Sequence, residues 1–169
     1  MADQTHASHR NFDETLALVE RELKARDRCL VLAESCTGGL LAERITNIAG
    51  SSEWFYGSFV TYQVRAKREM LGLDATALAQ HGPVSRSTAL AMVEHSLART
   101  SADYAIALTG LAGPDGDGSS AHVGELWIGW GDAEKQAYSA EPFELSASRD
   151  EFRAMACELA VAGLVARMF

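Results

Sequence analysis

Apolar residues follow two different patterns along this chain. Three stretches predict strands. CLVLA at 29–33 is a short continuous apolar run, as expected of a strand covered on both faces. WFYGSFVTY at 54–62 is rich in aromatic and β-branched residues, and YAIALTG at 104–110 ends at a glycine-rich loop. Elsewhere apolar residues recur at helical spacing, over about 11–23, 37–50, 65–73, 74–82, 84–100 and 149–169. The apolar stripes expected to face the core are Phe12, Leu16, Val19 and Leu23; Leu41, Ile45 and Ile48; Leu90, Val93 and Leu97; and Phe152, Met155, Leu159 and Leu164.

Two later segments, 125–131 and 136–145, predict an antiparallel pair of strands, because only the four residues DAEK join them. Strands that alternate with helices are typical of an α/β domain. We therefore expect a three-layer α/β/α sandwich with a mostly parallel mixed sheet of about five strands. Residues 1–10 are polar and predict a flexible N-terminus, and residues 11–169 predict a single domain.

Composition narrows the classes of partner. The chain has 169 residues, a net charge of -8 and no basic run, so we expect no nucleic-acid partner. Its three cysteines lack CxxC spacing, which argues against a structural zinc site or a disulfide framework. The start of the chain lacks the apolar core of a signal peptide, and no apolar run is long enough for a membrane span. These features predict a cytoplasmic protein without a membrane partner.

Candidate chemistry lies where the first three predicted strands end. The segments that follow them are 34–39, 63–67 and 109–118. Ligands of open, largely parallel sheets bind outside the carboxyl ends of the strands. If the three strands are parallel neighbours, these segments converge on one crevice.

The first segment contains ESCTGG, in which Ser35 has two interpretations. Either Ser35 or Thr37 caps the helix that follows, or Ser35 is a nucleophile beside backbone amides, from Thr37 to Gly39, that hold an oxyanion or a phosphate. Cys36 is a rival nucleophile, although a free cysteine is more often a small buried apolar residue.

A nucleophilic serine needs a base. His81 and His122 are candidates, and so is Lys67 if burial lowers its pKa; otherwise Lys67 is a solvated helix residue. The segment GLAGPDGDG lacks the ending of a phosphate-binding P-loop. Arg149 and Arg153 lie one helical turn apart, either as an anion clamp or as solvated surface residues.

Five motifs of the chain, taken together, resemble the CinA C-terminal domain family, also called the nicotinamide mononucleotide deamidase (PncC) family. They are AESCTGGLLAERIT, IAGSSEWFYGSFVTY with Lys67 after it, LGL with HGPVS, LTGLAGPDG and, more loosely, SRDEFRAMA. The resemblance implies hydrolysis of the carboxamide of nicotinamide mononucleotide to nicotinate mononucleotide and ammonia, without a metal or cofactor. It implies a Ser–Lys mechanism in which Ser35 is the nucleophile, Lys67 the base and Tyr62 an assisting residue. The substrate-binding residues expected on this basis, together with the amides named above, are Thr37, Gly38, Gly39, Thr109, Gly110, Gly113, Pro114, Gly116 and Arg149.

The chain departs from the family pattern at two places. Val64 stands where the family usually has Asn, and Ala147 and Ser148 precede Arg149 where the family tends to have Gly-Asp. Val64 favours an alternative function, a weakly active or inactive nucleotide-binding module that serves as a partner protein. The aromatic residues Trp54, Phe55, Trp127 and Trp130 either form a homodimer interface or pack in the core.

Overall fold

The computed structural model describes residues 4–169 of the chain, with side chains from Phe12 onward. Its elements are α1 (Gln4–Ala25), β1 (Leu30–Glu34), α2 (Leu40–Thr46), the short 3₁₀ helix η1 (Ser51–Glu53), β2 (Phe55–Val60), α3 (Val64–Leu71), α4 (Ala75–His81), α5 (Arg86–Ala98), β3 (Tyr104–Gly110), β4 (Glu125–Asp132), β5 (Ala137–Glu144) and α6 (Arg149–Met168). Helix α1 begins at Gln4, ahead of the start expected near residue 11. Residues 1–3 lie outside the described part of the chain, and flexibility of the N-terminal segment stays a prediction.

The five strands form one mixed sheet in the order β2-β1-β3-β4-β5. Strand β1 is parallel to both of its neighbours, β2 and β3, whereas β4 pairs antiparallel with β3 and with β5. Four strands therefore run in one direction and only β4 runs against them. The carboxyl ends of β2, β1 and β3 consequently lie side by side.

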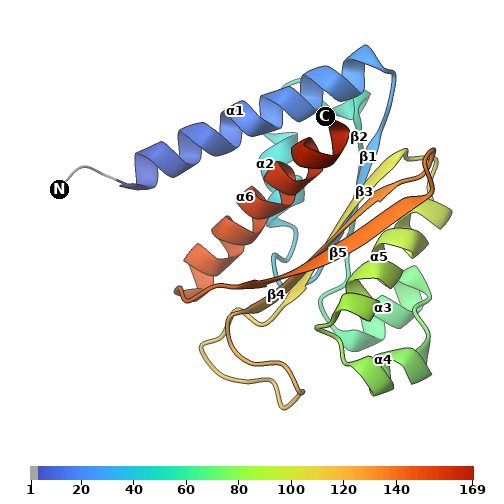
Figure 1. Cartoon of the computed structure of the whole chain (residues 1–169), viewed down its shortest axis with the longest axis vertical. Helices are drawn as coiled ribbons and strands as arrows, with labels where there is room; N and C mark the ends of the chain where they lie inside the picture. Colours follow the sequence, from blue (N-terminus) through green and yellow to red (C-terminus); the bar gives the residue numbers. More distant parts are fainter. Residues whose placement is uncertain (1–3) are drawn as a thin grey trace.

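Helices cover both faces of the sheet, with α1, α2 and α6 on one face and α3, α4 and α5 on the other (Figure 1). Alternate residues of β1 pack in two separate hydrophobic cores. Leu30 and Leu32 belong to one core, and Val31 and Ala33 belong to the other. Every residue of β1 is buried, which explains why its sequence is continuously apolar rather than alternating. The predicted three-layer α/β/α sandwich is confirmed.

Two of the expected apolar stripes are buried only in part, since α5 buries Val93 and Leu97 and α6 buries Phe152 and Leu164. Leu90 of α5 is only half-buried, and the buried face is formed by residues such as Ala89, Met92 and Val93. In α6, Met155 is 40% exposed although Phe152 is buried. Helical spacing alone leaves these choices open, because both helices are apolar over more than one stripe.

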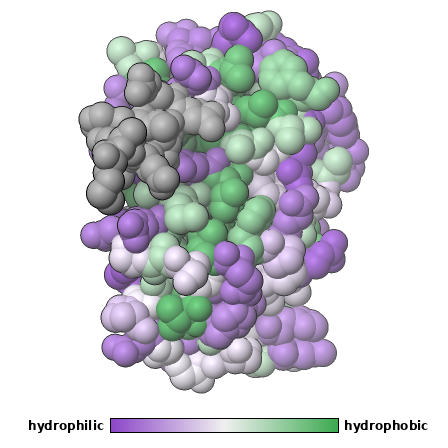
Figure 2. Space-filling view, turned by 60° about the vertical axis from the view of Figure 1, so that its left-hand side comes forward, coloured by the Kyte–Doolittle hydropathy of each residue, from purple (hydrophilic) through white to green (hydrophobic). Residues whose placement is uncertain are grey.

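Of the two alternatives for the aromatic residues, core packing is confirmed for Trp54 and Trp130, which are fully buried. Trp127 and Phe55 are half-buried, and a homodimer stays a prediction. In the face drawn in Figure 2, apolar residues are interspersed with hydrophilic ones. No helix within residues 4–169 is both long and apolar enough to cross a bilayer.

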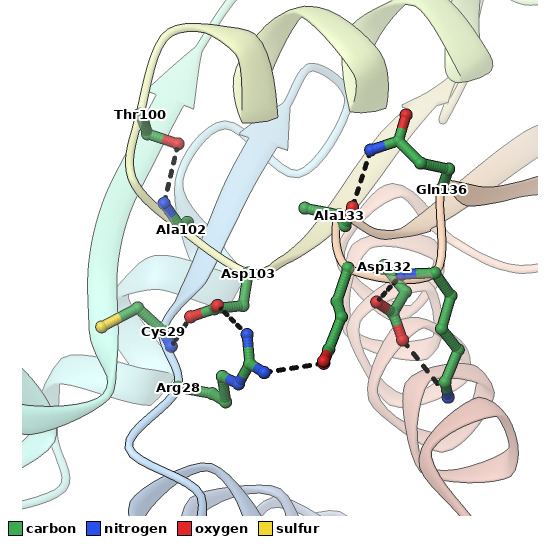
Figure 3. A network of polar contacts seen from close by, with 10 residues as sticks. Arg28, Cys29, Thr100, Ala102, Asp103, Asp132, Ala133 and Gln136 are labelled. Atoms are coloured by element: carbon green, nitrogen blue, oxygen red, sulfur yellow. Dashed lines mark hydrogen bonds and ion pairs between the residues drawn. The ribbon is translucent and has the colours of Figure 1, made fainter.

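A polar network joins the strands at the amino end of the sheet (Figure 3). The Asp103 carboxylate accepts hydrogen bonds from the Cys29 amide at 2.9 Å and from Arg28 Nη1 at 2.5 Å, and Arg28 Nη2 donates to Glu134 at 2.6 Å. These contacts tie the starts of β1 and β3 to the β4–β5 turn. The loops at the carboxyl ends of β1 and β3 take no part in this network.

Candidate active site

A pocket of about 180 Å³ lies at the carboxyl ends of β1, β2 and β3. The three segments predicted to converge do meet there, together with the start of α6. The residues that line the pocket are Ser35, Cys36, Tyr62, Val64, Lys67, Pro83, Val84, Thr109, Gly110, Leu111, Ala112, Asp117 and Arg149.

Ser35 lies in the turn between β1 and α2. Its amide donates to Leu108 O of β3 at 2.9 Å, so the parallel ladder continues one residue past β1. Gly38 and Gly39 take left-handed backbone conformations, with φ of 60° and 95°, which glycine adopts without the strain of a side chain. Ser35 is 7% exposed and is in the pocket wall. Neither Ser35 nor Thr37 is the N-cap of α2. That position is Gly39, which has no side chain with which to accept a hydrogen bond from the helix.

Glu34 takes the place of the missing cap. Its fully buried carboxylate accepts hydrogen bonds from the amides of Gly39, Leu41 and Ala42, each at 3.1 Å. It also accepts from Thr37 Oγ1 at 2.8 Å and from Ser58 Oγ at 3.0 Å. Sequence reasoning did not single out Glu34, and the signal that points to it is an acidic residue at the end of a buried strand, six residues before a helix whose N-cap is a glycine.

The expectation that the amides from Thr37 to Gly39 hold an anion is partly wrong. The Gly39 amide is bound by Glu34, and the Gly38 amide donates to Ser35 O at 3.0 Å. Neither amide is therefore available to an oxyanion or a phosphate. The amides of Cys36 and Thr37 are the ones that remain in this turn, and they lie near the Cys36 thiol, where they favour its thiolate form.

Lys67 lies in α3 rather than in a loop after β2, and it is 1% exposed. Its Nζ donates to Ser35 Oγ at 2.6 Å and to the Thr61 carbonyl at 2.9 Å. No carboxylate among residues 12–169 forms an ion pair with it, and burial lowers its pKa from 10.5 to about 8. The interpretation of Lys67 as a solvated helix residue is wrong.

The alternative bases and the alternative nucleophile fit the pocket less well. His81 and His122 do not line it, and His122 instead binds Glu144 at 2.8 Å, which raises the pKa of this exposed imidazole. Cys36 is 6% exposed, and burial raises the pKa of its thiol to about 12. A thiol with so high a pKa carries almost no thiolate near neutral pH. Of the candidate pairs, Ser35 with Lys67 has the geometry of a nucleophile and a base.

Tyr62 and Arg149 meet beside the pocket. Arg149 Nη2 donates to Tyr62 Oη at 2.7 Å, and Arg149 Nη1 donates to the Gly113 carbonyl at 2.8 Å. Both side chains are exposed. Arg153 lies apart from them, because its Nη2 donates to Thr37 O at 2.8 Å and it does not line the pocket. The two arginines therefore do not form the two-armed clamp.

The other predicted binding residues separate into two groups. Thr109 and Gly110 line the pocket; Thr109 Oγ1 donates to Pro83 O at 2.7 Å, and a Cβ at Gly110 would lie 2.7 Å from the Glu125 carbonyl. The residues that do not line the pocket are Thr37, Gly38, Gly39, Gly113, Pro114 and Gly116.

Residues that sequence reasoning did not select also line the pocket. Val84, Leu111 and Ala112 give it an apolar wall. Asp117 is its one acidic lining residue within the described chain, and hydrogen bonds from Ser119, first from its side chain and then from its amide at 2.9 Å, lower the pKa of this carboxyl. No group of three or more His, Cys, Asp or Glu side chains in the described part of the chain is placed to hold a metal.

A model of the CinA C-terminal domain matches residues 13–168. The chain belongs to this family. The CinA C-terminal domain described here is 41% identical over 143 residues to the nicotinamide-nucleotide amidohydrolase PncC of Escherichia coli K12, covering 85% of this chain and 86% of that protein. It is 40% identical to a CinA-like protein of Akkermansia muciniphila over 88% of this chain, but it spans only 34% of that longer protein.

Solved structures have the same fold as this CinA C-terminal domain. The crystal structure of the competence damage-inducible protein A from Klebsiella pneumoniae matches with a TM-score of 0.87 and 33% identity, over 92% of this chain and 95% of that one. A competence/damage inducible protein from Agrobacterium tumefaciens matches with a TM-score of 0.87 and 34% identity, over 92% and 94% of the two chains.

Proposed function

We propose that the protein is a cytoplasmic amidohydrolase of pyridine-nucleotide salvage. It hydrolyses the carboxamide of nicotinamide mononucleotide, and the products are nicotinate mononucleotide and ammonia. The observation that carries the proposal is the 2.6 Å contact between Ser35 Oγ and a lysine amine that is buried without a carboxylate partner. The identity to relatives named for this activity, 41% over 85% of the chain, supports the choice of substrate.

The proposed reaction has two halves. Neutral Lys67 takes the proton of Ser35 Oγ, which attacks the carboxamide carbon and forms a C–O bond. The C–N bond then breaks, and the Lys67 ammonium gives its proton to the departing nitrogen, which leaves as ammonia. Water attacks the resulting ester by the reverse relay, which releases the nicotinate carboxyl group and restores Ser35.

The oxyanion of the tetrahedral intermediate needs donors that the resting protein does not use elsewhere. We infer that the Cys36 and Thr37 amides serve this purpose, since Gly38 and Gly39 are occupied within the turn. A donor from the residue that follows the nucleophile is also the arrangement of other hydrolases whose serine lies at a strand-to-helix turn.

Two charged side chains suit the rest of the substrate. Arg149 has the geometry to bind a phosphate with two N–H groups, once it exchanges its contacts to Tyr62 and Gly113. Asp117 places a negative charge at a pocket whose substrate carries a positive pyridinium ring. The apolar wall, including Val64, suits the flat face of that ring.

The test is ammonia release from nicotinamide mononucleotide by four variants. Ser35→Ala and Lys67→Met should each lose at least about a thousandfold in kcat, while substrate binding survives. The matched controls are Ser52→Ala and Lys135→Met, which change exposed residues outside this pocket and should stay within about twofold. Activity that survives in Ser35→Ala contradicts the mechanism. Tight binding by the wild type without any ammonia would instead support the alternative of an inactive nucleotide-binding module.

A further inference from the structure

We propose that Glu34 is a positioning residue for this reaction, which holds the Ser35 turn against β2 so that Ser35 Oγ stays within reach of Lys67 Nζ. The inference rests on the proposed function of the Ser35–Lys67 pair. Glu34 itself does not line the pocket and is fully buried. Its action is therefore through its neighbours and not on the substrate.

The Glu34 side chain accepts five hydrogen bonds. Oε2 accepts from Thr37 Oγ1 and from the Gly39 and Leu41 amides, and Oε1 accepts from the Ala42 amide and Ser58 Oγ. The three backbone amides can only donate, so both side-chain oxygens of Glu34 act as acceptors. A buried charge is unfavourable unless hydrogen bonds replace its hydration, and here the amino end of α2 also favours a negative charge.

Glu34 is connected through its neighbours to both members of the reactive pair. Its side chain fixes the turn that follows Ser35, through Thr37 and Gly39. Its main-chain carbonyl accepts from the Thr61 amide at 2.8 Å, and the Thr61 carbonyl in turn accepts from Lys67 Nζ at 2.9 Å. One residue thus connects the serine side of the pair to the lysine side.

Helix capping alone does not account for these contacts. A cap needs only the amides of α2, whereas Glu34 also reaches Ser58 in the neighbouring strand β2. Thr37 is held a second time, because Arg153 donates to its carbonyl. The turn is therefore fixed relative to β2 and α6 as well as to its own helix. A displacement of about 1 Å in a reacting group can reduce the rate about a hundredfold.

The first experiment compares Glu34→Gln with Glu43→Gln. The side-chain amide of the Glu34→Gln variant can still accept through its one carbonyl oxygen, but an NH₂ group in place of Oε1 accepts from neither the Ala42 amide nor Ser58 Oγ. Glu43 is an exposed residue of α2 that binds only Asn47 locally, so its variant is the matched control. We expect Glu34→Gln to lower kcat about a hundredfold with KM within about threefold, and Glu43→Gln to leave both unchanged. In the Lys67→Met background Glu34→Gln should cause no further loss, because no relay is left to misalign.

Loss of thermal stability in Glu34→Gln with kcat within about threefold of the wild type would overturn the proposal, since Glu34 would then be only a structural cap. If Glu34→Gln does not fold, Ser58→Ala replaces it. Ser58→Ala removes the hydroxyl that donates to Glu34 from β2 and leaves the amides of α2 in place. We expect it to lower kcat about three- to tenfold at unchanged KM. An unchanged kcat refutes the proposal.

Crystal structures separate this inference from the proposed function. Absence of ammonia in the wild type would refute the function, whereas Glu34 is tested by the distance from Ser35 Oγ to Lys67 Nζ. This distance should exceed the hydrogen-bonding limit of about 3.5 Å in Glu34→Gln, or in Ser58→Ala where that variant is used, and remain near 2.6 Å in Glu43→Gln. An unchanged distance in the Glu34 and Ser58 variants overturns the positioning role whatever the activity.

Discussion

The protonation of Lys67 predicts a specific pH dependence of the reaction. In the proposed mechanism only the neutral amine can take the proton of Ser35, and burial lowers the pKa of Lys67 from 10.5 to about 8. At pH 7 about one molecule in eleven then has a neutral Lys67, against about one in 3,000 at the ordinary pKa. Burial thus raises the reactive fraction about 300-fold, which corresponds to about 3 kcal/mol.

The assay is initial-rate ammonia release between about pH 7 and 9.5, a range in which a phosphate monoester is already almost fully ionised. We expect kcat/KM to rise about fivefold from pH 7 to pH 8 and to level off above about pH 9, because the base is then neutral in most molecules. A rate that keeps rising about tenfold per pH unit to pH 9.5 would show that Lys67 retains an ordinary pKa. A flat profile from about pH 7 to 8 would show that a neutral Lys67 is not required. Either result refutes the reasoning.

Three further predictions concern residues of the pocket. Lys67→Met should raise the free energy of unfolding at pH 7 by about 1–3 kcal/mol in urea titrations, because the folded protein disfavours the charged amine. This gain should fall as the pH rises from about 8 through 10.5 and vanish above about pH 11.5, where Lys67 is neutral in both states. Iodoacetamide at about pH 7.5 should leave ammonia release intact, since the Cys36 thiol has a pKa of about 12, and inactivation that the substrate prevents would contradict this. Arg149→Gln should raise KM about tenfold and Asp117→Asn up to about fivefold with little change in kcat, and an unchanged KM would remove that residue from substrate binding.

The sequence is sufficient to predict the layers and the loops that meet at the site. Strands β1 and β3 are continuously apolar because both faces are covered, and the DAEK turn is too short for anything but an antiparallel connection. The convergence of three loops follows from parallel neighbours alone. The start of α1 at Gln4 is not predicted, because its first residues are polar and show no apolar stripe.

Two features of the site depend on contacts between distant segments, which a local pattern does not contain. Lys67 is surrounded by charged residues in RAKRE, and only the packing of α3 beneath the pocket buries it. Glu34 caps a helix that begins six residues later, so the usual search for a capping residue at the helix start does not find it. Arg149 and Arg153 are one turn apart, yet they bind different loops because the helix presents them in different directions.

The proposed reactive serine and lysine lie within residues 34–67 together with most of the groups that hold them. The exceptions are Arg153, which binds the Thr37 carbonyl, and the Leu108 carbonyl, which accepts from the Ser35 amide. Tyr62 and Val64 of the same stretch also line the pocket, and most of the remaining wall comes from later segments around Pro83, 109–117 and Arg149. The proposed catalytic pair is thus separate in sequence from most of the surface proposed to bind the ligand. Grafting a different 111–124 loop onto this scaffold is therefore a rational route to amidases with altered ligand preference and an intact reactive pair.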